Sequence, residues 1–148
     1  MKSLKIFFLA ALVALAGAFT ACTEDHDWNA GPVEEGAKVY FSNENASSVK
    51  VDNTMSSIDL TVMRTETEGI LEVSVAPEIN PDYASLFTVE PTLIFADGVA
   101  EGTVKVSFDY SKLQGGKTYE VAVKIVDETL HSSYAYASQT VSIIVPEP

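Results

Sequence analysis

Residues 119–125 read Tyr-Glu-Val-Ala-Val-Lys-Ile, and apolar side chains occupy every second position of the stretch. A period of two turns one set of side chains into a core and the other toward water, as in a β-strand with one wet face. The same period recurs in four further stretches, at 58–62, 71–75, 104–108 and 141–145. Together these stretches predict antiparallel sheets, because antiparallel sheets commonly keep one face in solvent.

Shorter apolar pieces and turn residues complete the predicted pattern. The pieces add strands at 39–41, 49–51, 86–89 and 93–95. Thr67-Glu68-Gly69 is expected to join the strands on either side of it as a hairpin, and residues 110–113 are expected to form one helical turn. Seven to nine short antiparallel strands in about 110 residues predict an all-β fold, an immunoglobulin-like β-sandwich over residues 37–148.

The composition of the chain excludes several classes of protein. The chain has 148 residues, 47% of them apolar, with one Cys, two His and a net charge of −12. Nucleic-acid binding needs basic side chains, so the acidity argues against it. One Cys and two His are too few for a disulfide framework or a Cys/His zinc cluster. The apolar fraction is too high for a disordered chain, so we expect a globular domain.

Residues 1–21 have the features of a secretory signal peptide. Lys2 and Lys5 form a short basic start, and residues 6–19 are an uninterrupted run of apolar and small residues. That run is shorter than the roughly 20 residues that span a bilayer as a helix. Removal of the signal peptide takes away two lysines and no acidic residue, which moves the net charge from −12 to −14.

Cys22 follows the predicted signal peptide directly. Phe19-Thr20-Ala21-Cys22 resembles a bacterial lipobox, in which the Cys is diacylated and becomes the first residue of the mature protein, although Phe19 stands where Leu is usual. The alternative is cleavage after Ala16-Gly17-Ala18, which would leave Cys22 as a free thiol. Because a lone unpaired Cys is unusual in a secreted protein, we expect Cys22 to carry a lipid that anchors the protein in a membrane.

Acidic residues follow the predicted anchor. Glu24, Asp25 and Asp27 begin a polar segment, 22–36, that is expected to be a tether. The acidic cluster resembles the surface-export signal of Bacteroidetes lipoproteins, which implies a place on the outer face of the outer membrane. A solvated acidic linker is the alternative. Trp28 also lies in the tether, so the Cys…Trp…Cys core of antibody domains is absent.

The order of short motifs in the predicted sandwich resembles a domain family of Bacteroidetes surface lipoproteins. The motifs are Phe87-Thr88-Val89-Glu90-Pro91 and the segments 93–98, 104–106, 110–113, 116–119 and 145–148. Members are domains of unknown function, distantly similar to the Calx-β sandwich, and usually precede a lectin-like or glycan-processing domain. The resemblance implies a non-enzymatic spacer or interaction module of a glycan-acquisition system. Its partner would be an outer-membrane protein or a glycan.

Few residues of the predicted sandwich could perform catalysis. His131 is the only histidine after the tether, and it lies beside Ser132 and Ser133. No nucleophile elbow, phosphate-binding loop or H-E-x-x-H motif accompanies them. We therefore expect His131 to be a polar loop residue and the protein not to be an enzyme.

Three other functions stay open in the sequence. Tyr134 and Tyr136 are two residues apart, so an extended segment would turn both rings to one side for carbohydrate contact, unless they pack at the rim of the core. Calcium takes six to eight oxygen ligands, and Asp127-Glu128 is the one adjacent acidic pair in the predicted sandwich, residues 37–148. We expect a solvated acidic surface there, with no metal site and no cofactor. An adhesin or pilus-type subunit that pairs through an edge strand is the third possibility.

Overall fold

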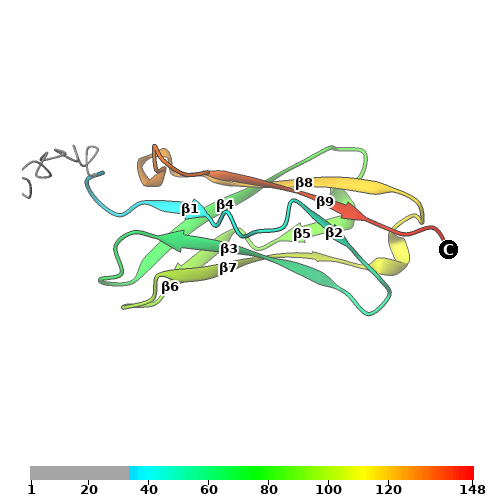
Figure 1. The fold of residues 1–148 in the computed structure, drawn as a ribbon, viewed down its shortest axis with the longest axis horizontal. Helices are drawn as coiled ribbons and strands as arrows, with labels where there is room; N and C mark the ends of the chain where they lie inside the picture. The colour runs from blue at the N-terminus through cyan, green and yellow to red at the C-terminus, as the bar shows by residue number, and fades with distance from the viewer. Residues whose placement is uncertain (1–33) are drawn as a thin grey trace, which may run out of the picture. The chain divides into compact units, whose positions relative to one another are not determined.

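Two β-sheets face one another in the computed structural model (Figure 1). The first sheet has the order β1 (Val39–Phe41), β3 (Ser57–Arg64), β7 (Glu101–Phe108), β5 (Phe87–Val89). The second has the order β2 (Ser48–Lys50), β9 (Ser138–Ile144), β8 (Thr118–Ile125), β4 (Leu71–Ile79), β6 (Thr92–Phe95). Three single-turn 3-10 helices, η1 (Ala84–Leu86), η2 (Tyr110–Lys112) and η3 (Glu128–Leu130), lie in the connections.

The structure describes residues 34–148, which form one unit. The predicted signal peptide, the lipidation site Cys22 and the export signal of Glu24, Asp25 and Asp27 lie outside the described residues. Within 34–148, no helix has the length and apolar character needed to cross a membrane.

The core lies between the two sheets and confirms the predicted β-sandwich. Strand β8 shows why, because its side chains alternate strictly between buried and more exposed positions, as the sequence pattern indicated. Val121, Val123 and Ile125 of this strand are almost fully buried. Each such side chain contributes about 1.5–3 kcal/mol on burial. Alternation in β3, β7 and β9 supplies the opposing and neighbouring parts of the same core.

One strand pair is parallel, where the sequence analysis expected only antiparallel pairing. Strand β2 runs alongside β9, with Ser48 opposite Ser142 and Lys50 opposite Ile144. The reason is that the chain passes from the first sheet to the second between β1 and β2. Strand β1 pairs with β3 in the first sheet, and β2 then forms the edge of the second.

The expected hairpin at residues 67–69 is wrong, because β3 and β4 belong to different sheets. Arg64, the last residue of β3, is only 4% exposed. Its guanidinium donates to the carbonyl oxygens of Val99 (2.6 Å), Gly69 (3.0 Å), Thr67 (2.6 Å) and Ala96 (2.8 Å). These bonds tie the β3–β4 connection to the β6–β7 connection across the end of the sandwich.

Strands β6 and β7 also lie in different sheets, and a glycine permits their close approach. A Cβ atom at Gly102 of β7 would lie 2.9 Å from Leu93 Cδ1 and 3.1 Å from Phe95 Cε1. Real Cβ contacts are wider than this, so the two β6 side chains occupy the space that a larger residue would need. Gly102 therefore lets the chain change sheets while both strands pack into one core.

Candidate functional site

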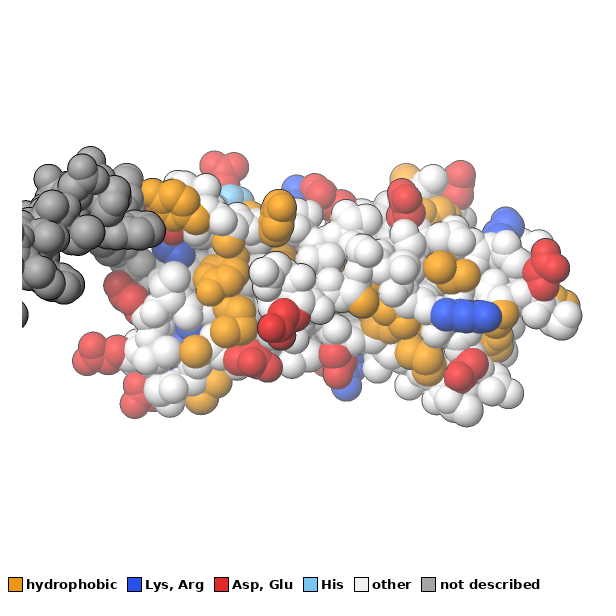
Figure 2. All heavy atoms as spheres, viewed as in Figure 1, with side chains coloured by type: hydrophobic (Ala, Val, Ile, Leu, Met, Phe, Trp, Pro, Cys, Tyr) orange, Lys and Arg blue, Asp and Glu red, His pale blue; other side chains and the backbone are white. Residues whose placement is uncertain are grey.

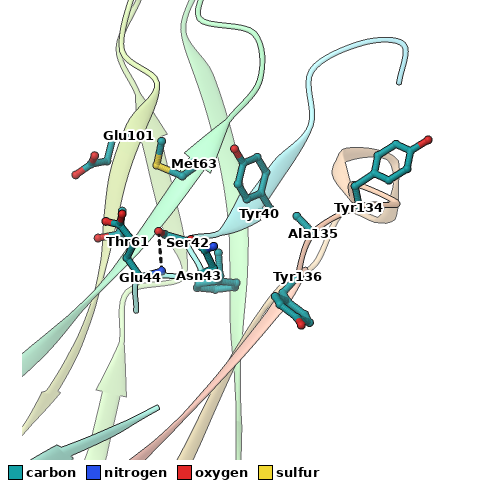
Figure 3. Close-up of a pocket in the computed structure, with 11 residues that line it drawn as sticks. Tyr40, Ser42, Asn43, Glu44, Thr61, Met63, Glu101, Tyr134, Ala135 and Tyr136 are labelled. Carbon is teal, nitrogen blue, oxygen red and sulfur yellow. Dashed lines mark hydrogen bonds between the residues drawn. The ribbon is translucent and has the colours of Figure 1, made fainter. Parts of the chain in front are cut away.

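A hollow of about 540 Å³ lies at one end of the sandwich, and we call it the tyrosine hollow. It is bordered by β1, by the segment that follows β1, by β3 and β7, and by a loop between β8 and β9 (Figure 3). Its lining residues are Tyr40, Phe41, Ser42, Asn43, Glu44, Thr61, Met63, Glu101, Tyr134, Ala135 and Tyr136. Hydrophobic side chains gather over β1 and β3, with acidic side chains close by (Figure 2).

The floor of the tyrosine hollow is a row of side chains across three strands. Tyr40 of β1 is paired with Met63 of β3, and Met63 is paired with Glu101 of β7. Paired residues on neighbouring strands project to the same face of a sheet. The row therefore forms a continuous surface on the outer face of the first sheet, with an aromatic ring at one end and a carboxylate at the other (Figure 3).

The segment after β1 is fixed to β3 by hydrogen bonds that continue the sheet. The side-chain amide of Asn45 donates from Nδ2 to the Thr61 carbonyl (2.8 Å), and its Oδ1 accepts from the Thr61 N–H (2.7 Å). The N–H of Ser42 donates to the same carbonyl (3.0 Å). Because both ends of the segment are held, the exposed Asn43 and Glu44 have a fixed backbone beneath them.

Residues 131–137, the tyrosine loop, form the remaining wall. Tyr134 is 67% exposed and Tyr136 is 70% exposed, so neither ring is part of the core. The expectation that both rings face the same side is wrong, because Ser133 and Tyr134 lie in a turn and not in an extended strand. Tyr134 points away from the other lining residues and Tyr136 points in a different direction (Figure 3). Tyr136 is joined to β1, since its carbonyl accepts from the Phe41 N–H (2.9 Å).

Glu34 holds the tyrosine loop from the start of the described chain. Its carboxylate accepts from the Ser132 hydroxyl (2.6 Å) and from the Ser133 N–H. These bonds, the one from Ser132 foremost, lower the pKa of Glu34 below its ordinary value. Sequence analysis placed Glu34 in the tether, whereas its side chain contacts the β-sandwich.

Further hydrogen bonds fix the start of the tyrosine loop and the 3-10 helix η3 that precedes it. His131 Nε2 lies 2.9 Å from the Ile125 carbonyl oxygen, and Lys38 Nζ donates to the Thr129 carbonyl (2.9 Å). Asp127 caps η3 by accepting from the Thr129 N–H (2.9 Å) and hydroxyl (2.7 Å), which lowers the pKa of Asp127. The Ser132 hydroxyl is directed to Glu34, so His131 and Ser132 bond to different partners and not to each other as a catalytic pair would.

The carboxylates of the sandwich, including Asp127 of the pair considered for calcium, do not form a cation site. Among residues 34–148, no group of three or more His, Cys, Asp or Glu side chains could hold a metal ion. Asp127 caps η3, and Asp109 caps η2 by accepting from the Ser111 N–H (3.1 Å) and hydroxyl (2.7 Å). Asp97 accepts from the Gly69 N–H (2.7 Å). Each of these oxygens serves a turn or a cap.

Tyr134 and Tyr136 were predictable from the sequence, but the rest of the tyrosine hollow was not. Tyr40 and Glu101 are 61 positions apart, and only the register of β1, β3 and β7 brings them into one row. Alternation shows which side chains share a face of one strand, but it does not show which strands are neighbours. No local signal in the sequence could have joined Tyr40 to Glu101.

No protein-family model and no curated protein sequence matches the chain. Several solved structures share its fold. The apo form of the Calx CBD1 domain superposes with a TM-score of 0.53 and 15% identity, over 73% of this chain and 96% of that domain. A "putative carbohydrate binding protein" from Bacteroides ovatus gives a TM-score of 0.55 and 15% identity, over 74% of this chain and 37% of that protein. A Bacteroides ovatus protein of unknown function gives 0.53 and 14%, over 72% of this chain and 46% of that one.

These likenesses show a Calx-β-like β-sandwich. The chain covers nearly all of the CBD1 domain but spans less than half of both Bacteroides ovatus proteins. At such identities the likeness extends to the fold, and the function has to be argued from the site.

Proposed function

We propose that this protein is a non-enzymatic, lipid-anchored surface module that binds a glycan in the tyrosine hollow. The observation that carries the proposal is the composition of the hollow: Tyr40, Tyr136 and Met63, with Tyr134 at the outer edge, beside the polar side chains of Asn43, Glu44, Thr61 and Glu101. Sugar rings present apolar faces that stack on aromatic rings, and their hydroxyls need donors and acceptors at the rim. The hollow offers both kinds of contact on a fixed backbone.

The similarity in fold to a Bacteroides ovatus protein named for carbohydrate binding gives further support. The exposure of Tyr134 and Tyr136 favours the ligand-binding interpretation over the alternative that both rings pack into the core.

A glycan array with the full chain tests the proposal. Wild type should show saturable binding that the double variant Tyr134→Ala/Tyr136→Ala loses while its thermal unfolding stays cooperative. Ile94→Ala, which shortens an exposed apolar side chain outside the tyrosine hollow, is the control and should bind as wild type does. If wild type binds no glycan, or if the double variant binds as well as wild type, the proposal is wrong.

A spacer or protein-interaction module is the second candidate, and one observation favours it. The first described residues and Pro148 lie at opposite ends of the long axis of the sandwich (Figure 1). A domain with this geometry extends the distance between the groups attached at its two ends. The spacer hypothesis predicts no glycan binding and instead an outer-membrane protein partner, which pull-down from an outer-membrane extract would identify.

The anchor and the location form part of the proposal and need separate tests. Cys22→Ser should move the protein from the membrane fraction to the soluble fraction, because acyl chains supply the membrane affinity. A mature amino terminus at Phe19 with a free Cys22 thiol would contradict the lipid anchor. Replacement of Glu24, Asp25 and Asp27 by their amides should protect the protein from protease added to intact cells, if these residues direct export to the outer face.

A further inference from the structure

The tyrosine hollow has a one-sided charge. Its lining includes two carboxylates, Glu44 and Glu101, and no lysine, arginine or histidine. Both glutamates are exposed to solvent (Figure 3). Carboxylates accept hydrogen bonds and donate none, so they can bind the hydroxyl groups of a ligand but not a second carboxylate or a sulfate.

The neighbouring cations lie outside the lining of the hollow. Lys38, two residues before Tyr40, keeps its charge, but its ammonium is held at the carbonyl of Thr129 (2.9 Å), which is not a lining residue. Arg64 is buried and donates to four main-chain carbonyls. Lys105 is four residues along β7 from Glu101, which is about 13 Å on an extended strand. That distance exceeds the screening length of about 8 Å at physiological salt.

We propose that the tyrosine hollow selects uncharged glycans and excludes acidic ones, such as uronic-acid, sialylated and sulfated glycans, with Glu44 and Glu101 as the specificity determinants. The inference rests on the proposed glycan-binding function and adds the class of glycan. Tyr40, Tyr136 and Met63 supply stacking surface that any sugar ring could use. The two glutamates discriminate, because an anionic group placed beside either of them is repelled. One close carboxylate pair in water should weaken binding about fivefold.

The test uses the full chain and an array that carries neutral oligosaccharides together with acidic ones, namely galacturonans, glucuronans, sialylated and sulfated glycans. We expect every glycan bound by wild type to be neutral. Oxidation of the primary hydroxyls of a bound glycan to carboxylates should weaken its binding fivefold or more at about 50 mM NaCl. Raising the salt to about 500 mM should narrow this difference, because salt screens exposed charges.

The variant Glu44→Gln/Glu101→Gln tests the role of the two glutamates. Glutamine keeps the size of the side chain, removes the charge and replaces one acceptor oxygen by an amide donor. The ratio of the affinity for the neutral glycan to the affinity for the oxidised one should fall at least fivefold in the variant, whatever the change in the affinity for the neutral glycan itself. As the matched control, Glu72→Gln removes a charge from β4, outside the tyrosine hollow, and should change neither affinity.

The outcomes separate the inference from the function that it rests on. A wild type that binds no glycan overturns both. A wild type that binds acidic glycans as tightly as neutral ones overturns the inference and leaves the glycan-binding function intact. A wild type that rejects acidic glycans, together with a double glutamine variant that rejects them equally, shows that the two glutamates are not the determinants.

Discussion

Aromatic side chains pack against one another at one end of the sandwich and are largely exposed at the other. At the end opposite the tyrosine hollow, Tyr83, Phe87, Phe108 and Tyr119 pack edge to face, with ring centroids 5.2–6.4 Å apart. At the hollow, Tyr134 and Tyr136 are largely exposed. Rings that contact one another in a core stabilise the fold. Rings that a loop holds in solvent can contact a ligand, so residue type alone does not separate structure from function.

The buried end also satisfies its polar atoms internally. The Tyr119 hydroxyl accepts from the Gln114 N–H (3.0 Å), and the Tyr83 hydroxyl lies 3.2 Å from both the N and the O of Glu120. A buried tyrosine normally needs such partners, because an unpaired polar atom in a core is costly. Both hydroxyls of the cluster therefore have main-chain partners within the fold, although Tyr83 is half-buried and borders the surface with Tyr119.

The largest expected effect is at the buried end. Phe87→Ala removes the ring that contacts Tyr83, Phe108 and Tyr119, and it should lower the free energy of unfolding by about 3–5 kcal/mol. Urea denaturation followed by circular dichroism measures this change. Phe87→Leu, which keeps most of the apolar volume, is the control and should cost much less. A loss below about 1 kcal/mol for Phe87→Ala would show that the cluster is not a structural unit.

The second prediction concerns the end that carries the hollow. There the buried Arg64 side chain, and not a cluster of rings, holds the β3–β4 and β6–β7 connections together. Arg64→Met keeps much of the volume but removes the guanidinium donors to the carbonyls of Gly69 and Val99. It also leaves the Thr67 and Ala96 carbonyls with main-chain donors alone. We expect a loss of about 3 kcal/mol in the free energy of unfolding. Arg64→Lys retains the charge with fewer donors, and it should fall between Arg64→Met and wild type. Equal stability of Arg64→Met and wild type would mean that the connection needs no polar anchor.

The third prediction sharpens the contrast at the exposed rings. Tyr134→Ala/Tyr136→Ala should change the free energy of unfolding by no more than about 0.5 kcal/mol, since exposed side chains contribute little to stability. Differential scanning calorimetry beside Phe87→Ala measures both ends under one condition. A loss comparable to that of Phe87→Ala would assign Tyr134 and Tyr136 to the structure and remove the contrast.

The smallest expected effect is a dependence on pH that both ends share. Asp109 caps η2 at the buried end and Asp127 caps η3 before the tyrosine loop, and in each case the hydrogen bond from the following Ser or Thr side chain is the main cause of a lowered pKa. A carboxyl whose pKa is lower in the folded state stabilises the fold above its unfolded pKa, near 3.8, and this contribution is lost as the pH falls through the lowered value.

The stability of wild type should therefore decrease as the pH falls below about 5. Asp109→Asn and Asp127→Asn should each make that decrease shallower, as urea denaturation at a series of pH values would show. Only Asp127→Asn should also weaken ligand binding, because η3 leads into the tyrosine loop. Equal effects of both variants on binding would contradict a local role of the η3 cap.

Much of the fold was predictable, because alternation is a property of each strand. The patterns at 58–62, 104–108 and 119–125 correspond to parts of β3, β7 and β8. Pairing was harder to predict, since it depends on contacts between distant strands. The connection at residues 67–69 is fixed by four hydrogen bonds from the Arg64 side chain to main-chain carbonyls. The sequence shows a charged residue at the end of a strand, but it does not show that this residue is buried.

The candidate site was predictable only where two of its residues are close in sequence. Tyr134 and Tyr136 could be identified as a pair, but the turn at Ser133 and Tyr134 that separates their rings could not. Asn45 shows the same limit. Its amide continues the sheet beside Thr61, a role that the sequence does not distinguish from that of an ordinary loop asparagine.

The parallel pairing of β2 with β9 has a mechanical consequence. Glu34 and Pro148 lie toward opposite ends of the long axis, so tension that passes through β1 to β2 draws β2 and β9 in opposite directions along their common axis (Figure 1). Because the strands are parallel, their bonds are loaded in shear, including that from the Val51 N–H to the Ile144 carbonyl (3.0 Å) and that from the Ser142 N–H to the Ser47 carbonyl (2.9 Å). Bonds loaded in shear must rupture together, whereas a hairpin opened from its end loses them one at a time. Under tension, this short edge pair would therefore act as a clamp that keeps the domain folded.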